Sequence, residues 1–277
     1  MKVHHLNAAT MCPFGGRLIS GRGGLLGRAH MVCHVLLIET DDGLVLVDTG
    51  LGTADLAAPR QRLGTGFVLM TQPCLDPAET ALAQVQALGF SADDVRHVVL
   101  THMDLDHAGG LGDFPKATVH LHAKEHEAAM ARRTMAAKQR YIPAQWAHGP
   151  SWKLYEAEGE EWFGFGAVRA LSDRESDVLL VPLFGHTAGH CGVAVRTPEG
   201  WILHAGDAYF HHGSMAAEPW TPKGLRAFQA GTDTIGTERR RNQERLRQLK
   251  QARGKEITMF CAHDPAELDA CCAGRRP

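Results

Sequence analysis

A strand-like segment that runs into four potential metal ligands is the feature that most constrains this sequence. His97 to Thr101 has the apolar pattern of a buried strand, and the segment HMDLDHAGG follows it directly. Two imidazoles and two carboxylates within six residues would be costly to bury unpaired, and this donor set suits zinc, manganese or iron. The four residues are His102, Asp104, Asp106 and His107. We therefore predict a metal centre at the carboxyl end of this strand, with an exposed polar loop as the alternative.

Three later segments place further ligand-type residues directly after apolar runs. The segment FGHTAGH presents His186, the segment LHAGD ends in Asp207, and the segment FCAHD presents His263. Each of these residues lies at the carboxyl end of a predicted strand, where loops gather and functional residues concentrate. A single ligand-type residue after a predicted strand would carry little weight. Together with the segment at residues 102–107, these three segments make four in one chain, and they predict a shared site.

The order of predicted elements indicates a layered α+β sandwich. Strands are expected at residues 33–39, 44–47, 97–101, 118–122, 178–183, 191–196, 201–205 and 256–261, and helices at residues 77–88, 91–94, 123–137 and 237–253. Asp41-Asp42-Gly43 fits the tight turn of a hairpin. Strands in two groups, with helices between and after them, are typical of stacked sheets covered by helices. We expect one domain over residues 1–277, with an aromatic-rich insertion at about residues 125–170.

The aromatic-rich part of this insertion, from Tyr141 to Phe165, is the candidate wall of a substrate pocket. Residues 139–165 hold three of the five tryptophans and two of the three tyrosines. Pockets for small organic molecules are mostly apolar with a few polar anchors. A hydrophobic plug or a homodimer contact is the alternative use of the same residues.

Composition excludes several classes of protein. The chain has 277 residues and a net charge of −2, so there is no electrostatic reason to expect a nucleic-acid partner. No apolar run is typical of a signal peptide or long enough to cross a bilayer, and we expect a cytoplasmic protein without a membrane partner. The seven cysteines are scattered without a CxxC, which argues against a disulfide framework and a cysteine zinc site.

The motifs, taken in order, resemble one protein family. DTG at residues 48–50, HxxxDHAGG at 102–110, GHTAGH at 185–190, GD at 206–207 and AHD at 262–264 occur as they do in the metallo-β-lactamase superfamily. The resemblance implies a four-layer αββα sandwich with a metal site at one edge, between the sheets. By position, one ion would be held by His102, His186 and Asp207, and a second by Asp106, His107 and His263, with Asp207 shared. Asp48 would be a buried structural carboxylate and not a ligand.

Asp104 departs from the family pattern HxHxDH, which has a second histidine at this place. An aspartate is shorter and anionic, and it can still coordinate, which gives a harder site that tolerates manganese or iron. Alternatively it withdraws and leaves the first site weak. We expect coordination, and hence two divalent ions, with zinc first and manganese or iron as alternatives.

Two residues are candidates for catalytic roles beyond metal binding. The position of Asp106 in the family allows it to accept a proton from the nucleophile or pass one to the leaving group. Tyr209 follows Asp207 by two residues and is a candidate donor to the oxyanion. Lactonases of the superfamily carry a tyrosine three residues after the shared aspartate, where this chain has Phe210, so a packing role for Tyr209 is the alternative.

The expected reaction is hydrolysis. Two divalent ions about 3.5–4 Å apart can share a water, lower its pKa and deliver hydroxide to a carbonyl or phosphoryl centre. Similarity to the lactonase branch favours an ester substrate, first a lactone such as an acyl-homoserine lactone. Open alternatives are a phosphodiester or organophosphate hydrolase and a non-hydrolytic diiron redox protein. A glutathione thioesterase and a β-lactamase are disfavoured, because neither a basic glutathione pocket nor an export signal can be recognised.

Overall fold

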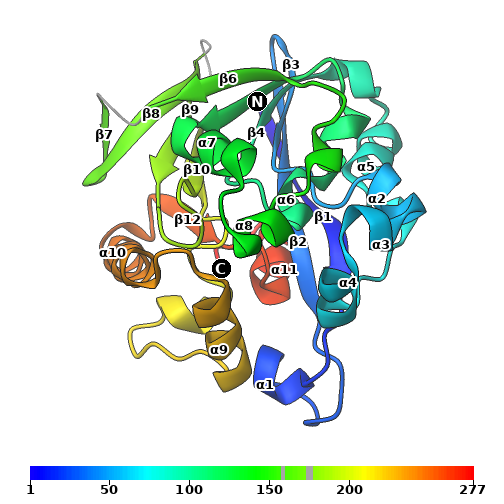
Figure 1. Cartoon of the computed structure of the whole chain (residues 1–277). Helices are drawn as coiled ribbons and strands as arrows, with labels where there is room; N and C mark the ends of the chain where they lie inside the picture. Colours follow the sequence, from blue (N-terminus) through cyan, green and yellow to red (C-terminus); the bar gives the residue numbers. More distant parts are fainter. Residues whose placement is uncertain (157–159, 173–176) are drawn as a thin grey trace.

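Two six-stranded sheets form the centre of the computed structural model, which describes residues 1–156, 160–172 and 177–277 (Figure 1). Across the first sheet the order is β1 (Lys2–Met11), β2 (Met31–Thr40), β3 (Gly43–Val47), β4 (Val95–Val99), β5 (Thr118–His122) and β6 (Ser151–Tyr155). Across the second it is β12 (Ile257–Phe260), β11 (Gly200–His204), β10 (Cys191–Thr197), β9 (Asp177–Pro182), β8 (Phe165–Ser172) and β7 (Glu160–Trp162).

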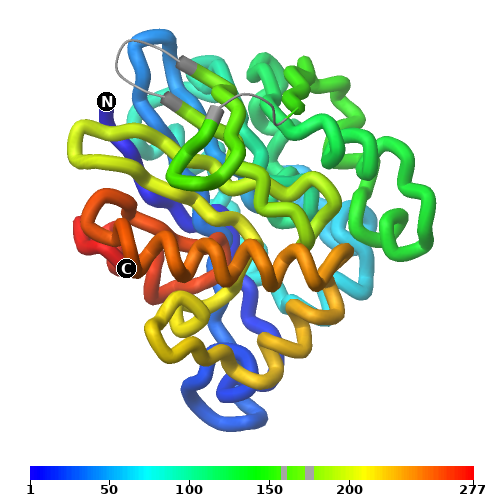
Figure 2. Tube along the Cα trace, turned by 90° about the vertical axis from the view of Figure 1, so that its left-hand side faces the viewer, coloured from blue at the N-terminus to red at the C-terminus, as the bar shows by residue number. Residues whose placement is uncertain are grey.

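Helices cover the outer face of each sheet. Val85 of α5 and Ala129 of α7 pack on the first sheet, while Leu246 and Leu249 of α10 pack on the second. Figure 2 shows α10 lying across the second sheet. The helices are α1 (Gly16–Ser20), α2 (Thr53–Ala57), α3 (Pro59–Arg62), α4 (Thr65–Thr71), α5 (Ala81–Ala87), α6 (Leu105–Ala108), α7 (Ala123–Ala131), α8 (Met135–Arg140), α9 (Lys223–Thr232), α10 (Gly236–Arg253) and α11 (Pro265–Cys272). Single 3₁₀ turns lie at Pro77–Glu79, Ala92–Asp94, Gly109–Asp113, Pro143–Gln145 and His212–Met215.

An apolar layer joins the two sheets. Leu36 and Ile38 of β2 face the second sheet, whereas Val35 and Leu37 face the helices, because alternate residues of a strand point to opposite faces. Each such fully buried side chain contributes roughly 1.5–3 kcal/mol relative to exposure. The predicted four-layer αββα sandwich is confirmed.

Strand direction brings the predicted ligands to one edge of the sandwich. β3 and β4 are parallel, and β11 and β12 are parallel. β9 runs in the same direction as β11, because both pair antiparallel with β10. The segments that follow β4, β9, β11 and β12 carry the four motifs, and they therefore leave their sheets at corresponding ends.

The predicted helices at residues 77–88 and 123–137 are wrong in their extent, and the first consists of a 3₁₀ turn at Pro77–Glu79 followed by α5. Residues 123–137 fall in two helices, because α7 ends at Ala131 and the next residue, Arg132, has a left-handed φ of 41°. The Thr134 hydroxyl then caps α8 by accepting the Ala137 N–H at 3.1 Å. After this break, α8 carries Arg140 to the edge of the sandwich where the predicted ligands lie.

In the part of the chain that the structure describes, no helix has the length and apolarity to cross a bilayer.

Candidate metal centre

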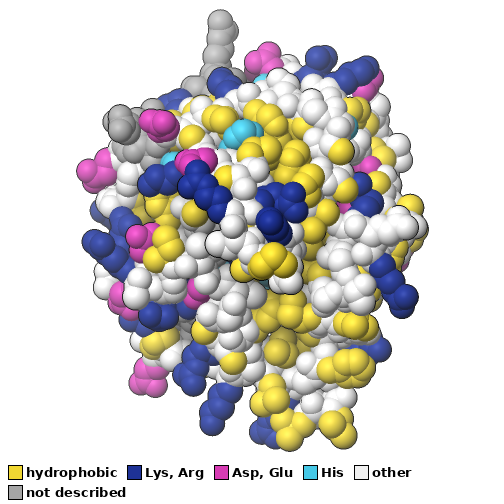
Figure 3. Space-filling model, viewed as in Figure 1, with side chains coloured by type: hydrophobic (Ala, Val, Ile, Leu, Met, Phe, Trp, Pro, Cys, Tyr) yellow, Lys and Arg dark blue, Asp and Glu magenta, His cyan; other side chains and the backbone are white. Residues whose placement is uncertain are grey.

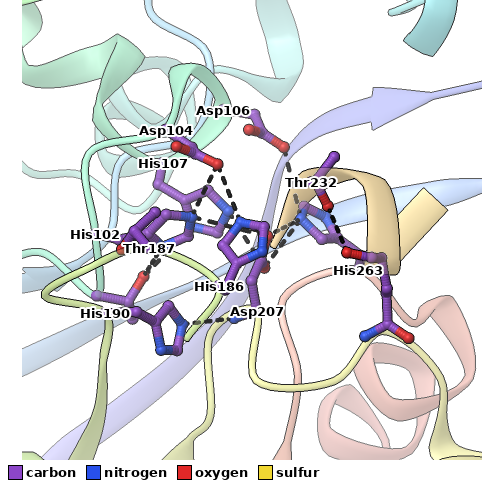
Figure 4. Close-up of polar contacts among 12 residues, drawn as sticks. His102, Asp104, Asp106, His107, His186, Thr187, His190, Asp207, Thr232 and His263 are labelled. Atoms are coloured by element: carbon purple, nitrogen blue, oxygen red, sulfur yellow. Dashed lines mark hydrogen bonds and ion pairs between the residues drawn. The ribbon is translucent and has the colours of Figure 1, made fainter. Parts of the chain in front are cut away.

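The segment after β4 carries four of the predicted ligands into the interior. His102, Asp106 and His107 are buried, and Asp104 is partly buried at the amino end of α6. A side chain at Gly109 would collide with the Asp55 carboxylate and the Gly50 carbonyl, so only glycine allows this close approach. The seven predicted ligand residues lie in one cluster, as Figure 4 shows.

The first half of the cluster is formed by two imidazoles and two carboxylates. Nε2 of His102 lies 3.5 Å from Oδ2 of Asp104 and 3.7 Å from Oδ2 of Asp207. Nε2 of His186 lies 3.0 Å and 3.3 Å from the same two oxygens. Asp104 therefore faces the site with one oxygen, as expected of a ligand that replaces a histidine.

The second half shares Asp207. Oδ1 of Asp207 lies 3.4 Å from Nε2 of His107 and 3.1 Å from Nε2 of His263. Nε2 of His263 is also 3.6 Å from Oδ2 of Asp106. Asp207 thus stands between the two groups, which is the place of a bridging ligand.

In His102, His107 and His263, Nδ1 forms a hydrogen bond away from the cluster, so that Nε2 is the ring nitrogen that faces it. Nδ1 of His107 donates to Asp48 at 2.8 Å, and Nδ1 of His263 donates to the Val32 carbonyl at 2.8 Å. Nδ1 of His102 donates at 2.9 Å to the Thr101 hydroxyl, whose own hydrogen goes to Asp48. Such partners fix the tautomer that metal binding needs.

These donor atoms fit a metal. Nε2 of His102, Nε2 of His107 and Oδ1 of Asp207 are buried and have no hydrogen-bond partner. Native proteins rarely leave buried polar atoms unsatisfied unless an ion or water completes them. Atoms about 2.1 Å from a common zinc ion lie roughly 3–4 Å from one another, which matches the spacings in both halves.

Asp48 has the structural role that the family resemblance implies. Its carboxylate accepts the Thr101 N–H at 2.7 Å, the Thr101 hydroxyl at 2.8 Å and Nδ1 of His107. The imidazole of His107 holds the pKa of Asp48 below its usual value against the opposing effect of burial. Asp48 has a left-handed backbone φ of 59°, which is unfavourable for a residue other than glycine. This conformation of the turn after β3 directs the carboxylate toward Thr101 and His107.

His190 orients Asp207 through the backbone. The Asp207 N–H donates to Nε2 of His190 at 2.9 Å, and Nδ1 of His190 donates to the Leu183 carbonyl at 3.1 Å. A side chain at Gly206 would meet Nε2 of His190 at 2.6 Å, and this glycine has a φ of 54°. His190 is therefore a positioning residue and does not point into the cluster.

Burial and charge act against each other at Asp207. Burial favours the neutral acid, but the imidazoles of His263 and His107 hold the pKa of Asp207 well below its ordinary value. The same pairing raises the pKa of His107 and of His263 against the effect of burial. Bound cations would replace the protons that balance these carboxylates.

Arg140 belongs to the site although no sequence pattern pointed to it. Its Nε lies 3.3 Å from Oδ1 of Asp104, and its Nη1 donates to the His186 carbonyl at 2.8 Å. The guanidinium also binds the Thr232 carbonyl at the end of α9. Arg140 thus holds the oxygen of Asp104 that faces away from the histidines.

The structure places Tyr209 away from the predicted oxyanion position. Its side chain is fully buried in the core beneath the second sheet, and its hydroxyl donates to Glu267 at 3.0 Å. The neighbouring Phe210 lines the cavity instead. The prediction that Tyr209 donates to an oxyanion is therefore wrong, and the packing alternative is correct.

A cavity of about 1400 Å³ opens onto the cluster. Its floor includes Asp104, Asp106, His186, Asp207 and His263. Its apolar walls are formed by Met11, Phe14, Ile19, Met31, Leu63, Phe67, Met70, Ile142, Phe210, Leu225 and Phe228. Figure 3 shows hydrophobic side chains gathered over this region, among α9, α1 and α4. The cationic residues Lys124, Arg133 and Lys138 also line it.

The predicted aromatic wall is largely wrong. Among the described residues of the aromatic-rich stretch, Tyr141 and Ile142 line the cavity, whereas Trp162 and Phe165 are buried in the core of the second sheet. Trp152 packs on the core of the first sheet. The cavity walls come mainly from the segment after β1, from α4, from α7 and α8, and from α9.

Comparisons with known proteins agree with this geometry. The family model described as the metallo-beta-lactamase superfamily matches residues 30–257. A Mycobacterium tuberculosis protein named "Probable metallo-hydrolase" is 42% identical over 265 residues, which cover 96% of this chain and 81% of that one. The N-acyl homoserine lactonase AttM of Rhizobium johnstonii is 32% identical over 238 residues, which cover 83% of this chain and 81% of that one.

A solved structure shows the same fold. It is an N-acyl homoserine lactone hydrolase with the product N-hexanoyl-L-homoserine bound at its catalytic metal centre, and it has a TM-score of 0.70 at 20% sequence identity over 98% of this chain and 96% of that one. The family match covers most of the sequence, and the mycobacterial relative is similar along nearly all of it. This chain therefore belongs to the metallo-β-lactamase superfamily and is a metallo-hydrolase.

Proposed function

We propose that this enzyme hydrolyses the ester bond of lactones that carry an acyl chain, with N-acyl homoserine lactones as its substrate class. The observation that carries the proposal is a cavity of about 1400 Å³ whose walls are mainly apolar and whose floor is the histidine–aspartate cluster. An acyl chain gains free energy from apolar walls, at roughly 0.8 kcal/mol for each buried CH₂. The polar ring would then lie over the cluster.

Similarity to named lactonases supports this substrate class. The lactonase AttM is 32% identical to this chain over 238 residues, which are 83% of this chain. The solved hydrolase that shares the fold carries an acyl-homoserine product at its metal centre. A polyphosphate substrate would leave most of the apolar wall without contact.

Two divalent ions, with zinc as the first choice, complete the proposed site. One would be held by His102, Asp104, His186 and Asp207, and the other by Asp106, His107, His263 and Asp207. When bound, such ions supply Lewis acidity that polarises the ester carbonyl and lowers the pKa of water. Neutral imidazole with carboxylate is the usual ligand chemistry of catalytic zinc.

Asp106 is the residue that we propose moves the proton. Its carboxylate lines the cavity and lies 3.6 Å from Nε2 of His263. In this role it would take a proton from the attacking water and return it to the alkoxide oxygen of the opened ring. Phe210 and Phe228 line the cavity near this end and help exclude bulk water.

A substrate panel tests the proposal. The purified enzyme, supplemented with zinc or with manganese, is assayed on γ-butyrolactone, hexanoyl- and decanoyl-homoserine lactone, an aryl ester, a phosphodiester and a thioester. We expect kcat/KM for decanoyl-homoserine lactone to exceed that for the phosphodiester and the thioester by at least about 100-fold. A higher kcat/KM for the phosphodiester would contradict the proposal, and so would visible absorption from two irons without hydrolysis.

The apolar wall is tested separately with a matched pair of variants. Phe228→Ala removes a ring from the cavity wall, and we expect KM for decanoyl-homoserine lactone to rise by about 10-fold with little change for γ-butyrolactone. Leu88→Ala removes an exposed apolar side chain that does not line the cavity and should leave both values unchanged. Equal effects of Phe228→Ala on the two substrates would show that the acyl chain does not use this wall.

A further inference from the structure

Two cysteines far apart in the sequence meet at the edge of the substrate cavity. Sγ of Cys12 lies 3.6 Å from Sγ of Cys74, although 62 positions separate them. Cys12 directly follows β1, and Cys74 lies three residues after the end of α4. Among the described residues this is the only pair of cysteine sulfurs in hydrogen-bond contact.

The backbone already holds the two cysteines side by side. The Cys12 N–H donates to the Thr71 carbonyl at 2.9 Å, and the Cys74 N–H donates to the Thr10 carbonyl at 2.9 Å. Met11 and Pro73 form an antiparallel bridge between them. A disulfide bond is about 2.05 Å long, so the sulfurs need to approach by roughly 1.5 Å, a distance that side-chain rotation can supply.

Solvent reaches this pair, unlike most of the other thiols. Cys74 is exposed and Cys12 is partly exposed, whereas Cys33, Cys191 and Cys261 are fully buried. A dissolved oxidant can therefore react first with Cys74, and Cys12 is close enough to react with the oxidised Cys74 afterwards.

The pair also joins two segments that line the cavity. Met11, Pro13 and Phe14 line it on the Cys12 side, and Met70 and Thr71 line it on the Cys74 side. A covalent bond between the cysteines would fasten these two parts of the wall to each other.

We propose that Cys12 and Cys74 are a redox-active thiol pair that forms an intramolecular disulfide across the wall of the cavity. The oxidant is a disulfide of the glutathione class. The Cys74 thiolate attacks one sulfur of the oxidised glutathione and releases one reduced glutathione. The Cys12 thiolate then attacks Cys74 in this mixed disulfide and releases the second glutathione. Two protein thiols lose two electrons and two protons, and the oxidant gains them.

The environment makes this a slow reaction. Although Cys74 is exposed, partial desolvation of its thiol, the contact with Cys12 and the Glu79 carboxylate raise the pKa of Cys74 to about 11, against an opposing effect of Arg28. The thiolate fraction is therefore small near neutral pH and grows about tenfold for each pH unit below that pKa. The pair suits a response to sustained oxidation more than rapid detection of peroxide. Its formation does not depend on which substrate the enzyme hydrolyses.

The test is incubation of the whole enzyme with oxidised glutathione, followed by thiol titration and peptide mapping by mass spectrometry. We expect two of the seven thiols to disappear, a mass loss of two hydrogen atoms, and a linked pair of peptides that contain Cys12 and Cys74. Cys12→Ser should stop at a glutathione adduct on Cys74. Cys272→Ser removes another exposed thiol and should oxidise like the wild type. Seven remaining thiols, or a disulfide that involves any other pair or a second chain, would overturn the proposal.

Hydrogen exchange tests the effect on the wall. In the oxidised enzyme, amide exchange in residues 65–71 should slow by at least about 10-fold relative to the reduced enzyme. The Cys12→Ser variant, treated in the same way, should show no slowing. A mapped Cys12–Cys74 disulfide with unchanged exchange in α4 would contradict the proposed fastening of the wall.

Discussion

Arg140 holds Asp104, and the two residues together occupy a place where the family pattern has a histidine. Nε of Arg140 lies 3.3 Å from Oδ1 of Asp104, while Oδ2 of Asp104 faces the imidazoles of His102 and His186. Burial raises the pKa of Asp104, but the Arg140 guanidinium and His102 hold it well below its usual range. Asp104 is thus charged and presents Oδ2 to the histidines, and the Arg140 guanidinium balances this negative charge, which a histidine at the same position would not carry.

Removal of Asp104 should weaken one half of the site. We expect Asp104→Ala to lower affinity for one divalent ion by at least about 100-fold, because a ligand is lost and Arg140 is left without its carboxylate. Asp104→His should keep two zinc ions per chain. Chelator competition with metal analysis measures both. Loss of all metal from Asp104→His would contradict coordination by Asp104.

Asp48 should matter for both stability and metal binding. Asp48→Ala leaves three buried donors unpaired, on Thr101 and His107, and we expect the free energy of unfolding to fall by about 3 kcal/mol. Metal affinity should fall about 10–100-fold, because His107 loses the partner that fixes its tautomer. Chemical denaturation and chelator competition are the measurements. Asp41→Ala, in an exposed turn, is the matched control; an equal effect there would refute this role.

Tyr209 should be structural and not catalytic. Tyr209→Phe removes a hydroxyl that donates to Glu267, so we expect a loss of about 1–3 kcal/mol of stability. Turnover should stay within about threefold of the wild type. Removal of an oxyanion donor usually costs about 100–1000-fold in kcat, so a loss of that size would restore the catalytic role.

Glu267 should give the fold a specific dependence on pH. Burial raises its pKa to about 7, against the opposing effect of Lys250. The folded protein binds this proton more tightly than the unfolded chain. The resulting stabilisation is complete below about pH 4.5 and is lost as the pH rises through about 7, a change of about 3 kcal/mol. We expect the stability difference between wild type and Glu267→Gln to fall by that amount over this range in urea denaturation. A difference that is constant with pH would show that Glu267 does not titrate there.

The sequence reveals the site better than the walls around it. His102, His186, Asp207 and His263 could be found because each follows an apolar run that folds as a strand and because ligand chemistry restricts residue type. The buried strands β2 and β3 are recognisable for the same reason, since most of their residues are apolar and buried on both faces. β1, with its half-polar sequence KVHHLNAATM, gives no such signal.

Arg140 and the cavity could not be predicted in this way. Arg140 reaches Asp104 only because the chain breaks at Arg132 between α7 and α8, and a helical alanine-rich pattern hides that break. The wall residues Phe67 and Phe228 come from separate helices whose tertiary placement decides what they line. Aromatic density indicated a pocket wall at residues 141–165, but most of those rings that the structure describes pack in the cores. Burial as such does not distinguish a core from a pocket.

Metal stoichiometry in Asp207→Ala tests the central claim most directly. Asp207 contacts His102 and His186 through Oδ2 and His107 and His263 through Oδ1, so both halves of the site depend on it. Inductively coupled plasma mass spectrometry of zinc-loaded protein, with lactone hydrolysis measured on the same samples, should give two ions per chain in the wild type. The variant should hold at most one ion and lose its turnover. Two ions and full turnover in the variant would contradict the account.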